Sequence, residues 1–160
     1  MGELFRFHGL DAVQNLHPLV VHYPIALLTL AAFLYVVAWL SKRDSWAWPA
    51  FWMLVVGTLA AGAALWTGLR ADTSVMVAQS VRDHILIHHK QVMIVVFAIS
   101  VLLAAWAISR PPMPRRGRLV FLALMIVTAL LIVKGADYGA WMVYGYNAGG
   151  ALPQPIEFSQ

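Results

Sequence analysis

The residues of this chain best suited to chemistry are its six histidines, which gather near the starts of two hydrophobic segments. They are His8, His17, His22, His84, His88 and His89. An imidazole in a membrane is costly unless it has a partner. Neutral imidazole is also the commonest protein ligand for zinc, copper and haem iron. The grouping therefore indicates a bound metal or haem.

The spacing of the histidines predicts which of them can meet. His84 and His88 are four residues apart and share one face of a helix, whereas His89 points about 100° away from them. His17 precedes a proline suited to a first helical position, and Pro24 must kink or restart the first segment. In an antiparallel bundle with short loops, the first and third segments begin at the same end. We therefore expect convergence of four histidines, which are His17, His22, His84 and His88.

The composition indicates an integral membrane protein. Hydrophobic residues make up 61% of the 160 residues and charged residues 11%, and the mean hydropathy is +0.74. The absence of cysteine excludes covalent c-type haem attachment, cysteine-ligated iron–sulfur clusters and thiolate catalysis. The formal charge of +4 comes mostly from loop arginines, so we interpret it as a topology signal and expect no nucleic-acid partner.

Hydropathy predicts an all-α fold, an integral membrane antiparallel four-helix bundle over residues 17–146. Each apolar segment is long enough to cross the hydrocarbon core. The predicted spans are about 20–40, 48–69, 85–108 and 119–143. Residues 1–16 are expected to form an N-terminal interfacial segment with a short helix, and residues 147–160 a C-terminal tail.

Basic residues in two short loops predict the orientation. These residues are Lys42, Arg43, Arg110, Arg115, Arg116 and Arg118. Dense basic loops stay on the cytoplasmic side. We therefore expect a multi-pass protein of the bacterial inner membrane, with both termini and all the histidines on the periplasmic side.

The second span carries a stripe of small residues spaced four, three and four positions apart: Gly57, Ala61, Ala64 and Gly68. Such stripes normally let two helices pack closely. The alternative is a slot for a flat macrocycle, and the two uses are compatible at different depths.

The segment Asn15 to Leu28 reads NLHPLVVHYPIALL. It resembles the signature of a family of predicted four-span bacterial membrane proteins catalogued as a domain of unknown function. The usual signature is His-Pro, a few apolar residues and His-Phe-Pro-Ile-Ala-Leu-Leu, so Tyr23 replaces a phenylalanine here. The similarity extends over nearly the whole chain, with weaker echoes at Thr67-Gly68 and Asp72. Some relatives are joined to or associated with cytochromes, and the resemblance therefore implies a redox role.

Chemically, the histidines suit one b-type haem, which needs two axial imidazoles from facing helices. His22 with His84 or His88 is the expected axial pair, with His17 nearby. Cationic side chains near the same boundary are expected to neutralise the propionates: Arg70, Arg82 and Lys90. Because the cytoplasmic half holds no histidine, we expect an outer-face relay, for example between quinol and a periplasmic cytochrome c or another respiratory subunit.

Two alternatives remain open. His84 and His88, joined by His17 or His22, suit a copper or zinc site that Asp72, Asp83 or Asp137 completes. The other alternative is a structural membrane anchor within a homo- or hetero-oligomer, in which interfacial histidines only cap helices or bind lipid headgroups. His89 is expected to face water or headgroups, and Lys134 and Asp137 to form a local ion pair. An electron-transfer or anchor subunit is favoured over a stand-alone enzyme.

Overall fold

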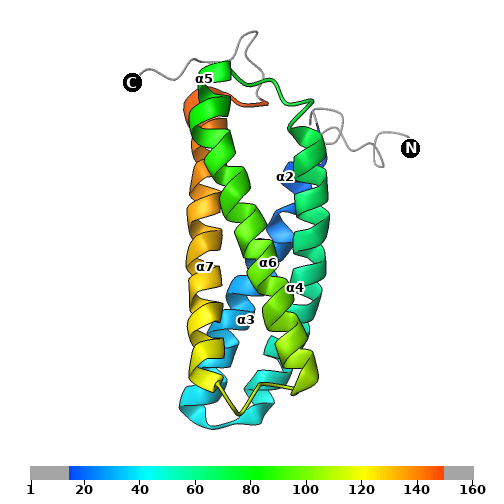
Figure 1. Ribbon diagram of the computed structural model, residues 1–160, viewed down its shortest axis with the longest axis vertical. Helices are drawn as coiled ribbons and strands as arrows, with labels where there is room; N and C mark the ends of the chain where they lie inside the picture. Colours follow the sequence, from blue (N-terminus) through cyan, green and yellow to red (C-terminus); the bar gives the residue numbers. More distant parts are fainter. Residues whose placement is uncertain (1–14, 150–160) are drawn as a thin grey trace, which may run out of the picture.

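The computed structural model describes residues 15–149, which form a long antiparallel bundle of helices (Figure 1). The elements are α2 (His17–Val20), α3 (His22–Ser41), α4 (Asp44–Ala71), α5 (Gln79–Val81), η2 (Arg82–Leu86), α6 (Ile87–Ser109), α7 (Arg118–Ala140) and η3 (Trp141–Gly145), where η marks a wider π-helical turn. The predicted all-α fold is confirmed. Residues 1–14, including His8 and most of the expected interfacial segment, and the tail from residue 150 lie outside the described residues.

Four continuous helical rods are long and apolar enough to cross a membrane. They are His17–Ser41, Asp44–Ala71, Gln79–Ser109 and Arg118–Gly145, of 25, 28, 31 and 28 residues. About 20 residues suffice to span the hydrocarbon core. The predicted four spans are confirmed, and each rod extends beyond the predicted ends.

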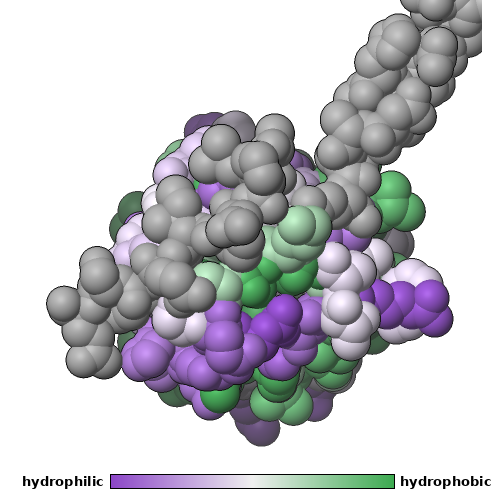
Figure 2. Space-filling view, turned by 90° about the horizontal axis from the view of Figure 1, so that it is seen from above, coloured by the Kyte–Doolittle hydropathy of each residue, from purple (hydrophilic) through white to green (hydrophobic). Residues whose placement is uncertain are grey.

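The outward faces of the rods are as apolar as their inward faces. Leu59, Leu102 and Leu130 are 71%, 69% and 64% exposed. A continuous apolar surface of this kind is unfavourable in water but matches the hydrocarbon of a bilayer. Hydrophilic residues instead gather on the end of the bundle that carries α5 (Figure 2). We call this the histidine end, and the opposite end, with the 110–118 loop, the arginine end.

Exposed aromatic side chains mark both boundaries of the apolar zone. Trp39, Trp46, Trp48 and Trp52 lie near the α3–α4 turn at the arginine end, whereas Tyr23, Trp66, Trp141 and Tyr144 lie toward the histidine end. Such belts occur where a protein crosses the headgroup region.

The main core fills the bundle from its middle to the arginine end. Tyr35 is fully buried and packs edge-on against Phe121, with ring centroids 5.0 Å apart. Its hydroxyl donates a hydrogen bond of 2.9 Å to the carbonyl oxygen of Pro112. This bond ties α3 to the loop between α6 and α7.

A second, smaller apolar cluster closes the histidine end. Its buried members are Ala78, Val81, Ile85 and Met142, from α5, η2, η3 and the segment before α5. Along α6 and α7, His89 and Gly135 lie between this cluster and the main core. The bundle therefore has two apolar layers with a partly polar layer between them.

The first rod loses one helical hydrogen bond where Pro24 requires it. α2 ends at Val20 and α3 begins at His22, with Val21 between them. Because Pro24 has no amide hydrogen, the carbonyl of Val20 cannot receive the usual helical bond. α3 restarts after Val21 as expected, while the backbone angles of Val21 remain helical (φ −61°, ψ −25°), so His17 stays part of the first rod.

Candidate functional site

Two histidines from different rods meet between the apolar layers. The ring centroids of His17, on α2, and His89, on α6, lie 6.5 Å apart, with the ring planes at 85°. Both side chains are half-buried. Of the four histidines expected to converge, His17 belongs to this pair, but its partner is the histidine that was expected to face water or headgroups.

The imidazole of His17 lies directly on α4. Its Nδ1 is 3.1 Å from the carbonyl oxygen of Ala64 and 3.3 Å from the hydroxyl oxygen of Thr67. Because a carbonyl oxygen can only accept, Nδ1 carries the proton and donates it. A Cβ added to Gly68 would come within 2.9 Å of Cε1 of His17. The imidazole ring of His17 therefore occupies space that a side chain at position 68 would fill.

The imidazole of His89 is held by α7 in the same way. Its Nδ1 donates a hydrogen bond of 2.8 Å to the carbonyl oxygen of Gly135. A Cβ built on Gly139, one turn further along, would lie at ordinary contact distance, 3.6 Å from Cε1 of His89. The ring thus lies beside a stretch of α7 without side chains at Gly135 and Gly139, and Met93 fills the space left at Gly135.

These two hydrogen bonds define what the pair can do. With its proton on Nδ1, a neutral imidazole has a lone pair on Nε2. Neither Nε2 has a hydrogen-bond partner among residues 15–149. Metal-ligating histidines almost always donate their other nitrogen to a carbonyl or carboxylate in this manner. Two imidazoles on opposite sides of one metal ion have ring centres about 6 Å apart, close to the observed separation.

The other histidines predicted as ligands lie elsewhere. His22, His84 and His88 are exposed. Nδ1 of His84 donates to the carbonyl oxygen of Ser80 at 2.8 Å, within its own rod. The ring of His88 lies beside that of Tyr138, with centroids 6.2 Å apart. In the described part of the chain, no group of three or more His, Cys, Asp or Glu side chains is placed to hold a metal ion.

A carboxylate gathers two of the predicted cationic residues at the histidine end. Asp72 binds Arg82 through Oδ1 at 2.7 Å and Lys90 through Oδ2 at 2.6 Å. Arg82 also donates to the backbone carbonyl of Asp72 at 2.8 Å. The cluster links the end of α4 to η2 and α6. Because two cations share one carboxylate, the cluster has a net charge of +1. Arg70 instead stacks on Trp66, 4.2 Å from the ring centroid.

A family model described as a predicted membrane protein, DUF2231, matches residues 13–151. The chain belongs to the DUF2231 family. The matched range contains all four rods and both members of the histidine pair. No curated protein and no solved structure matches the chain significantly. The resemblance noted in the sequence is confirmed at the level of this family.

Side chains of the first rod fill the small-residue stripe on α4 at both of its glycines. A Cβ at Gly57 would come within 2.9 Å of Leu28, and one at Gly68 would meet His17. Ala61 and Ala64 between them are buried. The stripe therefore allows the first rod to pack closely on α4 in this DUF2231 protein. His17, one of the side chains packed against the stripe, is a candidate functional residue.

Sequence reasoning did not place His89 in the site, because the inward face of its rod becomes visible only from burial in the structure. The rod that contains His89 turns an apolar stripe inward at Val81, Ile85, Val92 and Val96. His89 continues that stripe at spacings of four and three residues, as a helix face requires. His84 and His88 are out of phase with the stripe. The Lys134–Asp137 ion pair, in contrast, is present as expected, at 2.8 Å.

Proposed function

We propose that this protein is a membrane-embedded electron-transfer subunit that binds one b-type haem, with His17 and His89 as the axial ligands. The observation that carries the proposal is the pair of imidazoles from facing rods, 6.5 Å apart, with both Nδ1 protons donated to backbone carbonyls. The proposal keeps the cofactor expected from the sequence and moves the axial pair from His22 with His84 or His88.

The hydrogen bonds at Nδ1 support a ligand role for both rings. Donation from Nδ1 to a carbonyl fixes the tautomer and the direction of the ring, and makes Nε2 a better electron donor. Helix backbone supplies both carbonyls, Ala64 on α4 and Gly135 on α7. A haem bound here would supply one-electron redox chemistry. The residues of the chain hold and orient it.

Charge at the histidine end is consistent with an anionic cofactor. The cluster of Asp72, Arg82 and Lys90 has a net charge of +1, and Lys90 directly follows His89. An excess positive charge close to an apolar region attracts carboxylates such as haem propionates. Arg70, on the last turn of α4, adds a further cation at this end.

The position of the site determines the direction of the proposed relay. No histidine follows His89 in the sequence, and the five histidines within residues 15–149 lie in the halves of the first and third rods nearer the histidine end. A single cofactor there cannot carry electrons across the bilayer. We therefore propose that the histidine end is periplasmic in a bacterial inner membrane. The site would exchange electrons with quinol and with a periplasmic cytochrome or another respiratory subunit.

A second candidate, a single copper ion, follows from the close packing of His17 on Gly68. A ring pressed onto the α4 backbone suits a small guest, and imidazole is a good ligand for copper. Zinc fits less well because its sites almost always use three or four protein ligands, and two are present here among the described residues.

Spectroscopy and metal analysis of the purified full chain test the proposal. Protein from haem-replete cells should show the absorption of a reduced b-type haem, at one equivalent per chain. His17→Gln and His89→Gln should each abolish or strongly shift that spectrum. His22→Gln and His84→Gln change exposed rings and are matched controls that should retain it.

Circular dichroism establishes that each variant remains helical. A colourless wild-type protein would overturn the haem assignment. One equivalent of copper, lost in the same two variants, would then establish the copper candidate. A protein that is colourless and free of metal would contradict both cofactor proposals and favour the role of a structural membrane anchor.

A further inference from the structure

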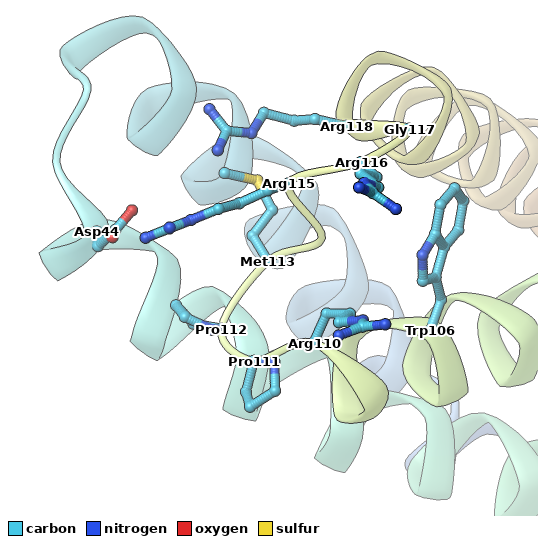
Figure 3. A pocket seen from close by; sticks show the side chains of 10 residues that line it. All are labelled: Asp44, Trp106, Arg110, Pro111, Pro112, Met113, Arg115, Arg116, Gly117 and Arg118. Atoms are coloured by element: carbon cyan, nitrogen blue, oxygen red, sulfur yellow. The ribbon is translucent and has the colours of Figure 1, made fainter.

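The arginine end contains a large cavity that the proposed electron-transfer role does not use. Its volume is about 860 Å³. The lining residues are Asp44, Trp106, Arg110, Pro111, Pro112, Met113, Arg115, Arg116, Gly117 and Arg118. All but Asp44 come from the end of α6, the following loop and the start of α7 (Figure 3).

Charge in this cavity is strongly unbalanced. Four arginines line it, and Asp44 is the single carboxylate among the lining residues, which leaves a net charge of +3. In Figure 3, Arg115 points toward Asp44, and Arg116 lies on the side of Trp106. Nε of Arg118 is buried without a hydrogen-bond partner among the described residues. An unpartnered buried donor is costly, and a bound anion removes that cost.

The backbone of the loop is shaped around Trp106. Gly117 has φ of 72°, a left-handed conformation that favours glycine. A Cβ added there would also come within 2.8 Å of the Trp106 ring. The loop therefore closes tightly over the indole. No side chain caps the α7 N-terminus that follows, and free amides at a helix N-terminus favour an anion.

The surroundings of the cavity place it at the level of lipid headgroups. The exposed tryptophans at the arginine end include Trp46 and Trp48, close to Asp44 in sequence. Ile108, at the end of α6, is 56% exposed, and Leu119, at the start of α7, is 65% exposed. A headgroup in the cavity would therefore have its acyl chains beside apolar side chains of two neighbouring helices.

We propose that this cavity binds the phosphate group of an anionic phospholipid through Arg110, Arg115, Arg116 and Arg118. Arginine suits this role because its planar guanidinium presents paired donors to phosphate oxygens. The cationic cluster distinguishes lipids that carry net negative charge from zwitterionic ones. A lipid held there would also brace the α6–α7 loop against α4, which provides Asp44.

Native mass spectrometry of the full chain tests this site. The chain is released from nanodiscs that contain equal amounts of phosphatidylglycerol and phosphatidylcholine. We expect one phosphatidylglycerol to remain bound after the other lipids dissociate, with about tenfold or greater preference over phosphatidylcholine. Equal retention of the two lipids by the wild type would overturn the proposal, whatever the behaviour of any variant.

Paired substitutions locate the site. Arg116→Gln with Arg118→Gln should reduce retention of phosphatidylglycerol about tenfold or more. Lys42→Gln with Arg43→Gln removes the same charge from the same end, outside the cavity lining, and should retain it. Equal loss in both pairs would show general surface attraction and overturn the assignment to the cavity.

A third arm separates lipid from free phosphate. Delipidated protein in neutral detergent is titrated with inorganic phosphate and, separately, with short-chain phosphatidylglycerol. We expect much tighter binding of the lipid, because the apolar residues beside the cavity contribute. Equal or tighter binding of inorganic phosphate would overturn the lipid assignment and identify the site as one for soluble phosphate.

Discussion

His89 and Gly135 join α6 to α7 through a hydrogen bond of 2.8 Å from the imidazole to a helix carbonyl. His17 makes the equivalent contact with Ala64 on α4, at 3.1 Å. The two rings and their hydrogen-bond acceptors therefore come from all four rods. Changes that move either ring should affect both the bound group and the packing of the bundle.

Gly68→Ala should displace the ring of His17. The added methyl group would come within 2.9 Å of Cε1, so ring or helix must move, at a cost of about 1–3 kcal/mol in stability. We expect loss of the haem or metal signal and a lower melting temperature. Gly139→Ala is the matched control, because its methyl group would lie 3.6 Å from His89. Equal binding by both variants would contradict a site that depends on the position of His17.

Asp72→Asn should loosen the histidine end. The substitution removes the carboxylate that binds both Arg82 and Lys90, whose side chains are only 32% and 36% exposed. We expect a loss of about 1 kcal/mol or more in the free energy of unfolding, measured by denaturant titration in detergent micelles.

Asp137→Asn provides the control for Asp72→Asn. It breaks an ion pair whose partners are 53% and 62% exposed, and it should leave stability nearly unchanged because solvent screens the pair. Equal effects of the two substitutions would show that the Asp72 cluster contributes no more than a surface pair.

Tyr35→Phe should weaken the arginine end without affecting the histidine pair. The lost hydroxyl donates to the carbonyl of Pro112 at 2.9 Å, and Tyr35 is fully buried. We expect destabilisation of about 1 kcal/mol and unchanged cofactor content. Tyr144→Phe changes a residue that is 89% exposed and should be neutral. Loss of the cofactor from Tyr35→Phe would show that the two ends are coupled.

Single cysteines can establish the orientation, because the chain has none of its own. Ser74→Cys lies at the histidine end and Ser109→Cys at the arginine end, both at exposed positions. In intact spheroplasts, a membrane-impermeant thiol reagent should label Ser74→Cys, and it should label Ser109→Cys only after lysis. The reverse pattern would place the histidines on the cytoplasmic side and remove the proposed periplasmic relay.

Hydropathy and proline chemistry predicted the number of spans, their antiparallel arrangement and the helix restart before Pro24. The rotation of each helix about its own axis was not predictable in this way. A lipid-facing side is as apolar as a buried one, as Leu102 on α6 shows, so hydropathy alone gives little sign of which face turns inward. In the structure His89 turns inward and bonds to Gly135 of α7, whereas His84 and His88 are exposed.

Two glycines mark the contact points of the imidazole rings that hydropathy did not reveal. Gly68 on α4 leaves space for the imidazole of His17, and Gly135 on α7 carries the carbonyl that accepts the hydrogen bond from His89. The stripe that contains Gly68 was recognised in the sequence as a packing surface. That His17 is the side chain packed against Gly68 could not be predicted, because the sequence does not give the register between the first and second rods.

The first rod stays helical through Val21, so His17 is rigidly connected to the long helix that follows it. The backbone angles of Val21 are helical (φ −61°, ψ −25°), and its amide and carbonyl bond to His17 and Ile25. Helices adjust their inclination as bilayer thickness changes. A change in the inclination of α3 is therefore transmitted to His17 and to its contacts with Ala64 and Thr67 on α4, which makes the pair sensitive to the thickness of the surrounding bilayer.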